Sequence, residues 1–338
     1  MKLLFINNSL INLNNKNINK VGGIEHCNIE LVKGLSRLGH EVTLVSKIKN
    51  KQKVNNITNL PLNYLTSIEN NNFYDIVVSS NHSEFFQFQN KSIKVLWLHN
   101  QLQIEKSLRK KQLWPIIKYK PHIVFVSDYL KKKTSSFYRF SSKTVIPNGC
   151  SELFFKNQRS KNIKPIFIWT IKREKGLNEI IDIWCKKIFI ELPLAELHIH
   201  GIRKSKKSVV NVDYNKFGIK FFGLVSREFL ANKYKFSTAM LHPGYDETFC
   251  ISALEALSSG LPVITINRTA LAERVINDYN GFKVNNFDDM ADVAINLFKN
   301  ETISKRLSNN AANDSKKFRW ENIAFRWNKY FEKLKLTN

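Results

Sequence analysis

Several signatures that would assign a function directly are missing from this sequence of 338 residues. Its 4 cysteines are widely spaced and form no C-x-x-C pair, which argues against a disulfide framework or a thiolate zinc site and fits a reducing compartment. No G-x-x-x-x-G-K-[ST] motif and no G-x-S-x-G motif occurs. A P-loop nucleotidase and a hydrolase with a nucleophile elbow are therefore poor interpretations.

Long hydrophobic runs are missing too. The chain starts MKLLFINNSL, and its first apolar run is shorter than the roughly 7–15 residues of a signal-peptide core. No run approaches the roughly 18 apolar residues of a membrane span. We expect a cytoplasmic protein, either free or held peripherally on the inner face of a membrane.

Positive charge is abundant. The chain carries 53 Lys and Arg against 28 Asp and Glu, a net charge of +25, with 43% hydrophobic residues. Such a balance is typical of a soluble globular protein with anionic partners, such as nucleic acid, acidic lipid or phosphorylated substrates. The preference for lysine over arginine and the abundance of asparagine fit a composition bias equally well, so the charge alone names no function.

The first half of the chain alternates strand-like and helix-like segments. Short apolar runs predict strands at 2–6, 41–46, 75–79, 93–98, 123–127 and 144–146. Helical spacing of apolar residues predicts a helix over 23–39. The Asn-rich stretch 50–72 is interpreted as a loop-rich insertion. This rhythm predicts a parallel α/β sheet.

The rhythm restarts after a turn signal at Pro147-Asn148-Gly149. Strands are predicted at 165–170, 196–200, 219–222, 239–242 and 262–266, and helices at 176–189, 252–259, 288–298, 303–317 and 320–334. We therefore expect two Rossmann-like domains, 1–148 and 149–318, facing each other across a cleft. A final helical segment, 319–338, is expected to return to the first domain.

The most informative segment is 244–260, GYDETFCISALEALSSG. Glu247 and Glu255 are eight positions apart, and a helix is expected to begin near Phe249. The amides of Thr248, Phe249 and Cys250 would then be available to a phosphate at the helix start. A carboxylate about two turns into the helix can accept both hydroxyls of a ribose. From spacing alone, an ordinary helix-start carboxylate and a surface glutamate remain the alternative.

These residues resemble a family signature. ETFCISALE is similar to the Glu, seven residues, Glu pattern of retaining glycosyltransferases of the glycogen-synthase-like group, glycosyltransferase family 4. The resemblance extends to F-x-G-x-V-S at 221–226, to SGLPVIT at 259–265, and to Glu273 and Asn280-Gly281-Phe282 further on. It covers almost the whole chain and implies the two-domain GT-B fold.

The resemblance also implies a grip on the donor diphosphate. Glu174-Lys175-Gly176 resembles the family's E-K-G at the start of a helix, in which the lysine binds the diphosphate. The family's Gly-Arg five residues earlier is replaced here by Trp169-Thr170, and Lys172 or Arg173 is the candidate substitute. A solvated lysine at a helix start is the ordinary alternative for Lys175.

Two features of the first domain fit the same family. Gly22-Gly23 resembles its opening loop, which we assign to the acceptor or a phosphate. The segment VLWLHN at 95–100 resembles the strand that brings a histidine to the cleft, so His99 is expected near the transferred sugar, with a structural role as the alternative. His82 also follows a predicted strand and is left open.

The resemblance implies transfer of a hexose-type sugar from a nucleotide-diphosphate sugar to a glycan or lipid-linked acceptor, with retention, in surface polysaccharide or lipopolysaccharide synthesis. Glu247 would stabilise an oxocarbenium-like transition state, and His99 would orient a sugar hydroxyl. We expect no metal, no cofactor besides the nucleotide sugar (a UDP- or GDP-sugar, for example) and no nucleic-acid partner. The absence of D-x-D, often used to hold a metal–diphosphate, agrees with this. A catalytically inactive basic binding protein on the same scaffold is the main alternative, and a nucleotide-sugar epimerase or phosphorylase is a third.

The segment 106–120 mixes basic residues with aliphatic and aromatic ones. Such a surface can lie on an anionic membrane. The plainer interpretation is a solvated amphipathic helix broken at Pro115.

Overall fold

The computed structural model describes residues 1–13, 22–67, 73–88, 91–156, 164–170, 176–202 and 213–337. The chain divides into two compact units. Unit 1 comprises Met1–Gly149 and Phe318–Asn338, and unit 2 comprises Cys150–Lys317. The acceptor-side and donor-side roles expected for the two halves stay predictions.

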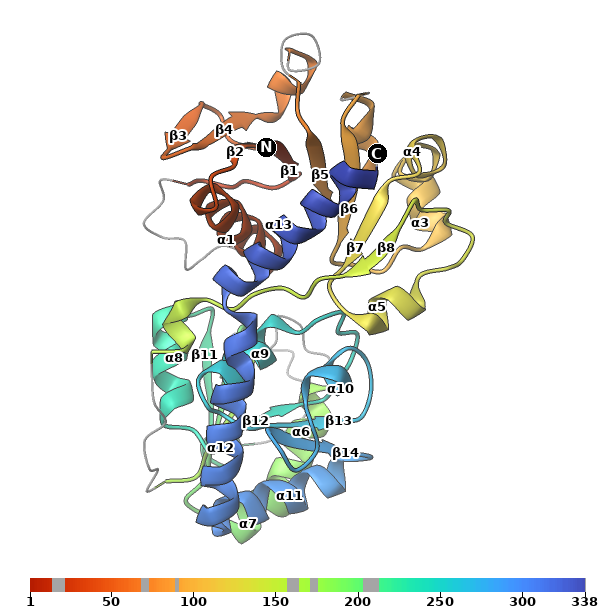
Figure 1. Ribbon diagram of the computed structural model, residues 1–338. Helices are drawn as coiled ribbons and strands as arrows, with labels where there is room; N and C mark the ends of the chain where they lie inside the picture. Colours follow the sequence, from red (N-terminus) through yellow and green to blue (C-terminus); the bar gives the residue numbers. More distant parts are fainter. Residues whose placement is uncertain are drawn as a thin grey trace. The chain divides into compact units, whose positions relative to one another are not determined.

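Unit 1 is built on an eight-stranded sheet with the order β3-β4-β2-β1-β5-β6-β7-β8 (Figure 1). All neighbouring strands are parallel except β3 and β4. The strands are β1 (Lys2–Ile6), β2 (Glu41–Ser46), β3 (Gln52–Val54), β4 (Ile57–Pro61), β5 (Ile76–Ser80), β6 (Ile93–Leu98), β7 (His122–Phe125) and β8 (Lys143–Val145). The central strands are almost wholly buried, as expected for a parallel sheet covered on both faces.

The helices of unit 1 are α1 (Gly23–Arg37), α3 (Ile104–Arg109), α4 (Leu113–Tyr119), α5 (Asp128–Lys133) and α13 (Trp320–Thr337), with 3₁₀ turns η2 (Leu62–Tyr64) and η3 (Ser83–Phe88). The C-terminal helix α13 lies along α1 (Figure 1). A methyl group placed on Gly34 would lie 2.6 Å from the Cβ of Ala324, so the two backbones approach closely at this point. Trp327 is fully buried and packs edge-on against Trp97 of β6 at 5.2 Å. The last helix is therefore part of the core of unit 1, as predicted.

Unit 2 has an all-parallel sheet of six strands in the order β11-β10-β9-β12-β13-β14. The strands are β9 (Ile166–Thr170), β10 (Glu196–His200), β11 (Ile219–Gly223), β12 (Ala239–His242), β13 (Val263–Ile266) and β14 (Gly281–Val284). The helical segments are η4 (Glu152–Phe154), α6 (Leu177–Ile183), the π-helical turn η5 (Trp184–Ile188), α7 (Phe189–Glu191), α8 (Arg227–Lys235), α9 (Ile251–Ser258), α10 (Leu271–Arg274), α11 (Phe287–Lys299), α12 (Glu301–Ser315) and η6 (Lys316–Phe318). Phe167, Trp169, Trp184 and Leu197 lie in its core.

Each sheet contains a point at which the strand order reverses direction. In unit 1 this point lies between β1 and β5, and in unit 2 it lies between β9 and β12. Open α/β sheets bind ligands outside the carboxyl ends of the strands at such a switch point. The segments that follow β1, β5, β9 and β12 are therefore the first places to look for sites.

The predicted fold class is confirmed, since both units are parallel-sheet α/β structures. The interpretation of 50–72 as loop was wrong for its first part, where β3 and β4 form the edge of the sheet. The predicted helix break at Pro115 was also wrong: Pro115 lies within α4, where the first turn tolerates a residue without an N–H, and the break falls near Lys111. Among the described residues, no helix is long and apolar enough to cross a membrane.

Candidate functional sites at the two switch points

The loop after β12 in unit 2 has an unusual backbone. Gly244, Asp246 and Cys250 all have positive φ, at 74°, 50° and 62°. Residues other than glycine rarely adopt this conformation, and such strain collects at functional sites. The loop between Pro243 and Cys250 is thus held in a shape that its local sequence alone would not choose.

Contacts from the segment after β13 hold this loop in place. Arg268 donates from Nε and Nη2 to the carbonyl of Pro243, at 2.9 and 2.7 Å. The guanidinium also lies 3.7 Å from the ring centroid of Tyr245. Thr269 Oγ1 donates to Gly244 O at 2.9 Å, and the amide of Ala270 donates to the carbonyl of Glu247 at 3.2 Å. Together these contacts fix the backbone that carries Glu247.

Gly176, the glycine of the E-K-G segment, packs against the same loop. Its φ is +78°, and a methyl group placed there would overlap Pro243, with Cγ at 2.6 Å. Only glycine satisfies both the backbone angle and the close approach. The two segments singled out in the sequence therefore meet at this point in unit 2.

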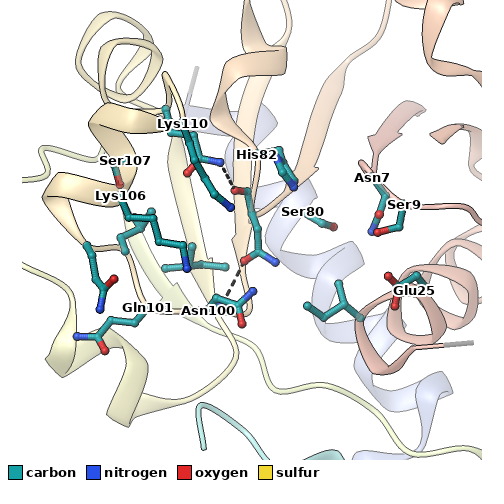
Figure 2. Close-up of a pocket in the computed structure, with 16 residues that line it drawn as sticks. Asn7, Ser9, Glu25, Ser80, His82, Asn100, Gln101, Lys106, Ser107 and Lys110 are labelled. Carbon is teal, nitrogen blue, oxygen red and sulfur yellow. Dashed lines mark hydrogen bonds between the residues drawn. The ribbon is translucent and has the colours of Figure 1, made fainter. Parts of the chain in front are cut away.

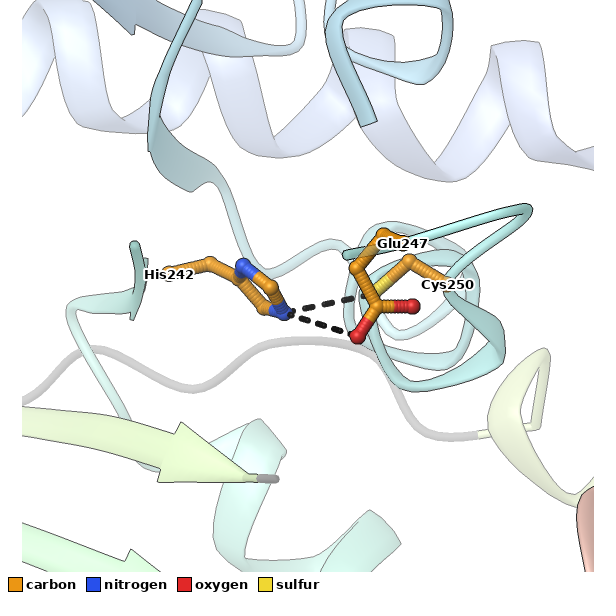
Figure 3. A group of neighbouring side chains, drawn as sticks. All are labelled: His242, Glu247 and Cys250. Atoms are coloured by element: carbon orange, nitrogen blue, oxygen red, sulfur yellow. Dashed lines mark hydrogen bonds and ion pairs between the residues drawn. The ribbon is translucent and has the colours of Figure 1, made fainter. Parts of the chain in front are cut away.

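Glu247 lies beside His242 and Cys250 (Figure 3). The Nε2 atom of His242 is 3.4 Å from Cys250 Sγ and 3.7 Å from a carboxylate oxygen of Glu247. The imidazole is fully buried, whereas the Glu247 side chain is 25% exposed. Burial, with a smaller effect of Arg268, lowers the pKa of His242 to about 3, so the ring is neutral at neutral pH.

The tautomer of His242 follows from its other nitrogen. The amide of Gly244 donates to Nδ1 at 2.9 Å, so in the neutral ring the proton is on Nε2. That N–H points between the sulfur and the carboxylate. Three such side chains within 4.8 Å could form a metal site, but a metal on Nε2 would displace this proton and oppose the Gly244 contact. The arrangement fits a neutral histidine packed beside Glu247 and Cys250 better than a metal centre.

Helix α9 agrees with the predicted helix 252–259 to within one residue but begins two residues after the start expected near Phe249. Its first residue is Ile251 and Cys250 is its N-cap, so Thr248 and Phe249 lie in the preceding loop. The expectation that the helix begins near Phe249 was wrong because the left-handed Cys250 interrupts the helical backbone. Phe249 and Cys250 are buried, with Arg274 stacked 4.3 Å from the Phe249 ring, and burial raises the pKa of the Cys250 thiol.

Glu255, the fifth residue of α9, is buried. Its Oε1 accepts a hydrogen bond from Arg227 Nη2 at 2.6 Å, and both side chains are largely covered, with 7% and 13% exposed. Arg227 comes from the start of α8. Its second terminal nitrogen, Nη1, has no hydrogen-bond partner among the described residues. The pair therefore offers an arginine N–H beside the carboxylate that the sequence assigned to ribose.

Three of the predicted donor residues, Lys172, Arg173 and Lys175, lie outside the described residues. The two residues that depart from the family pattern are described. Trp169 is fully buried in the core, and the carbonyl of Thr170 accepts a hydrogen bond from Ser252 Oγ of α9 at 3.3 Å. The end of β9 is thereby tied to the first turn of α9.

In unit 1, Gly22 is the N-cap of α1, and its carbonyl accepts the amide of His26 at 3.0 Å. Gly23 is the first residue of that helix. His99 follows β6, as predicted, but its side chain is only 4% exposed and packs against Trp97 in a tilted arrangement, with the ring centroids 4.4 Å apart. Burial lowers the pKa of His99 to about 3.

A polar pocket of about 170 Å³ lies at the switch point of unit 1 (Figure 2). It is lined by Asn7, Ser9, Ile24, Glu25, Ser80, Asn81, His82, Leu98, Asn100, Gln101, Leu102, Gln103, Lys106, Ser107, Lys110 and Gln112. The lining does not include His99, Gly22 or Gly23. The next two residues of α1, Ile24 and Glu25, do line the pocket. His82, left open from the sequence, lies in the wall and pairs with Glu84 at 2.7 Å.

Comparison with known proteins agrees with this architecture. Residues 151–314 match the family described as glycosyl transferases group 1. An uncharacterized glycosyltransferase of Methanocaldococcus jannaschii is 29% identical over 216 residues, covering 63% of this chain and 59% of the relative. The chain therefore spans about three fifths of the length of this curated relative.

Solved structures share the whole fold. Sucrose-phosphate synthase from Thermosynechococcus elongatus aligns over all of both chains, with a TM-score of 0.77 at 14% identity. Anabaena Alr3699/HepE in complex with UDP and glucose aligns over 98% of this chain and 100% of that chain, with a TM-score of 0.72 at 14% identity. The two parallel-sheet units thus form a GT-B fold. The match to the glycosyl transferases group 1 family lies within unit 2.

Sequence reasoning missed three residues of these sites. Arg227 and His242 bear on the two glutamates through contacts that only the fold creates, although His242 at the end of a predicted strand was a usable signal. Asn81 was not singled out in the sequence. It has a positive φ of 62° and lines the pocket, and its side chain accepts the amides of His99 and Asn100.

Proposed function

We propose that this protein transfers a hexose-type sugar from a nucleotide-diphosphate sugar to a hydroxyl of a glycan or lipid-linked acceptor, with retention of configuration. The observation that carries the proposal is the meeting of the E-K-G glycine, Gly176, with the strained loop that presents Glu247. This combination lies at a switch point, within the part of the chain that matches the family. The bound UDP and glucose of Anabaena Alr3699/HepE favour a uridine donor.

Each donor-side residue is given a role by its chemistry. Glu255, held by Arg227, would accept the ribose hydroxyls, and Arg227 Nη1 is positioned to donate beside it. Lys175, with Lys172 or Arg173, would neutralise the leaving diphosphate. The amides of the loop from Thr248 to Cys250 and of the first turn of α9 would support the same negative charge.

Glu247 would lie beside the donor sugar and stabilise positive charge as the glycosidic bond breaks. Its neighbour His242 is neutral, with Nε2 at 3.7 Å from the carboxylate, so it adds no second charge beside Glu247. His99 does not line the pocket of unit 1. We propose that it has an indirect role, in which its buried side chain positions the neighbouring residue Asn100, which does line the pocket. No metal or further cofactor is part of the proposed reaction.

The test is a transfer assay with radiolabelled UDP-glucose, UDP-galactose and GDP-mannose, in which released nucleoside diphosphate is measured against time. Wild-type protein is expected to release the diphosphate from one donor, and Glu247→Gln is expected to release it at least 100-fold more slowly while still binding it. Retention is checked by the anomeric coupling constant of the product in proton NMR. Donor binding without release in the wild type would instead support the inactive binding protein.

We further propose that the acceptor is presented at an anionic membrane on its cytoplasmic face, in surface polysaccharide or lipopolysaccharide synthesis. The surface of α3 and α4 carries exposed apolar side chains: Leu108, Trp114 and Ile117 are 58%, 69% and 46% exposed to solvent. Lysines and an arginine lie among them. Aromatic and aliphatic side chains combined with basic residues favour the interface of an anionic bilayer.

Sedimentation with vesicles tests this second proposal. Vesicles of phosphatidylglycerol and phosphatidylcholine should carry the protein down at low salt, and those of phosphatidylcholine alone should not. Trp114→Ala should weaken the interaction, whereas Phe137→Ala, which removes an exposed aromatic residue on a different segment, should not. Equal recovery with both vesicle types would remove the membrane from the proposal.

A further inference from the structure

We propose that the pocket of unit 1 binds the anionic part of the acceptor, a phosphate or carboxylate carried by a hydroxyl-rich molecule. The inference rests on the proposed function, because the acceptor is the second substrate of that reaction. The pocket volume of about 170 Å³ far exceeds the roughly 10–15 Å³ that one water requires. The cavity is therefore large enough for a substrate group.

Two lysines provide the positive charge. Lys106 lies in α3 and Lys110 is its C-cap, one helical turn further on, since the amide of Lys110 donates to the carbonyl of Lys106 at 3.0 Å. Both side chains line the pocket and extend from α3 toward the strand ends (Figure 2). Neither forms an ion pair with any residue in the described ranges.

The four-residue spacing of Lys106 and Lys110 brings two positive charges close together when no ligand is bound. Like charges four positions apart on a helix repel each other. An anion between the two ammonium groups would remove the repulsion and accept charge-assisted hydrogen bonds from both. The pair therefore favours an anionic ligand over a neutral one.

The acidic side chain that lines the pocket does not cancel this charge. Glu25 is folded over Gly22, where a methyl group would overlap its carboxylate. This places the carboxylate at the start of α1, where the helix dipole stabilises a negative charge. Among the described lining residues, the Glu25 carboxylate therefore interacts with the start of α1. The positive charges of Lys106 and Lys110 remain available to a ligand.

The opposite wall is suited to hydroxyl groups. Asn81 Oδ1 accepts the amides of His99 and Asn100, at 2.8 and 3.2 Å, and this fixes which end of its side-chain amide is the oxygen. Gln112 Nε2 donates to the carbonyl of Asn81 at 3.0 Å. The Nδ2 group of Asn81 is consequently a fixed donor in the wall, and Asn100 and Gln101 add further amides.

The experiment measures binding of inorganic phosphate and of glucose 6-phosphate, glucuronate and glucose to the full chain by calorimetry at low salt. We expect at least one anionic probe to bind at least 10-fold more tightly than glucose. Lys106→Gln and Lys110→Gln should each weaken that probe by roughly 10- to 100-fold, as for loss of a hydrogen bond to a charged group. Arginine at either position should restore part of the affinity. Lys118→Gln and Lys120→Gln, on and after α4, are the matched controls.

The source of the anion is distinguished with vesicles of phosphatidylglycerol and phosphatidylcholine. If the pocket lysines change vesicle binding but not binding of the soluble probes, the anion belongs to a lipid headgroup; the reverse result indicates a soluble sugar phosphate or acid. The inference is overturned if no anionic probe or vesicle binds the wild type more tightly than the Lys106→Gln/Lys110→Gln double variant. UDP affinity, measured on the same samples, reports the donor site separately, so failure of the proposed function would be seen as loss of UDP binding in the wild type.

Discussion

The two units place their sites at the same topological position but build them in different ways. In unit 2, the loop after β12 is strained, its neighbours His242 and Glu255 are buried, and Glu255 is paired with Arg227. In unit 1, the pocket is lined by amides, hydroxyl groups and the two lysines Lys106 and Lys110. The unit 2 site is held in place by contacts within the protein. The charge of the unit 1 pocket, in contrast, is carried by the long side chains of Lys106 and Lys110.

This difference has an energetic consequence. Removing a buried group such as Glu255 or filling the space at Gly176 disturbs close packing or leaves a buried charge alone, so stability and ligand binding should fall together. Removing a lysine from the unit 1 pocket disturbs neither, so only ligand binding should fall. Four predictions test this contrast.

The largest effect is expected for Glu255→Ala. Loss of the carboxylate leaves the Arg227 guanidinium buried without its counter-charge, which should lower the free energy of unfolding by about 3–5 kcal/mol. Urea unfolding measures this. Lys106→Ala in unit 1 should change stability by no more than about 0.5 kcal/mol. Removing both partners, in Arg227→Ala/Glu255→Ala, should recover part of the loss, and strict additivity of the two single changes would contradict the pairing.

Glu247→Gln should separate chemistry from stability. The side chain is 25% exposed, so unfolding should change little, while kcat should fall about 100- to 1000-fold as an electrostatic contribution to the transition state is lost. Steady-state kinetics with the active donor gives kcat and KM. Lys110→Gln should instead raise the acceptor KM and leave unfolding unchanged. A Glu247→Gln variant with nearly full kcat would remove Glu247 from the reaction.

A pair of glycines isolates the effect of packing. Gly176→Ala should destabilise unit 2 by about 2–4 kcal/mol, because it combines a positive φ with overlap against Pro243. Gly39→Ala in unit 1 has a φ of +88° but no atom within 4 Å of the added methyl, so about 1–2 kcal/mol is expected. Thermal unfolding of both variants checks the order, and equal losses would show that the backbone angle alone decides.

Acid should affect unit 2 more than unit 1. Burial lowers the pKa of His200 and His242 in unit 2, and of His99 in unit 1, to about 3. The unfolded chain, with a histidine pKa near 6.5, then binds more protons, so stability is full above pH 6.5 and falls as the pH drops from 6.5 toward 3. Each histidine contributes about 1.4 kcal/mol per pH unit in this window.

Hydrogen exchange at pH 7, 6 and 5 can follow the two units separately. The loss per pH unit should be greater in unit 2, and His200→Phe, which keeps an aromatic ring on Phe222, should reduce it. Equal stability at pH 7 and pH 5 would contradict buried neutral histidines.

The sequence predicted the parts of the fold that depend on local pattern. The bounds of β1, β2, β6, β10 and β12 agree with the predicted strands because continuous buried runs ended by polar residues leave little choice. Strands β3 and β4 were missed because polar residues interrupt their apolar runs, although Asn59 of β4 is buried in the fold. Strand β14 begins directly after Asn280 and is only four residues long, which is too short a signal.

The candidate sites divide in the same way. The spacing of Glu247 and Glu255 could be recognised because it lies within one loop and one helix. The partners of these glutamates could not, because Arg227 reaches Glu255 across 28 positions and Gly176 meets Pro243 only after β9 and β12 pair. The roles of the glutamates themselves stay predictions. For His99, the sequence predicted its place after β6 but not its burial on Trp97.

The most direct test of the central claim is a thermal shift with UDP, GDP, ADP and CDP on the wild type and on Glu255→Gln, which keeps the side-chain volume beside Arg227. A ligand at 100 times its Kd stabilises the folded state by about 2.7 kcal/mol, which raises Tm measurably. We predict that one nucleotide, UDP, raises the Tm of the wild type and that the shift is lost or much reduced in Glu255→Gln. No shift with any of the four nucleotides would contradict a nucleotide-sugar site in unit 2.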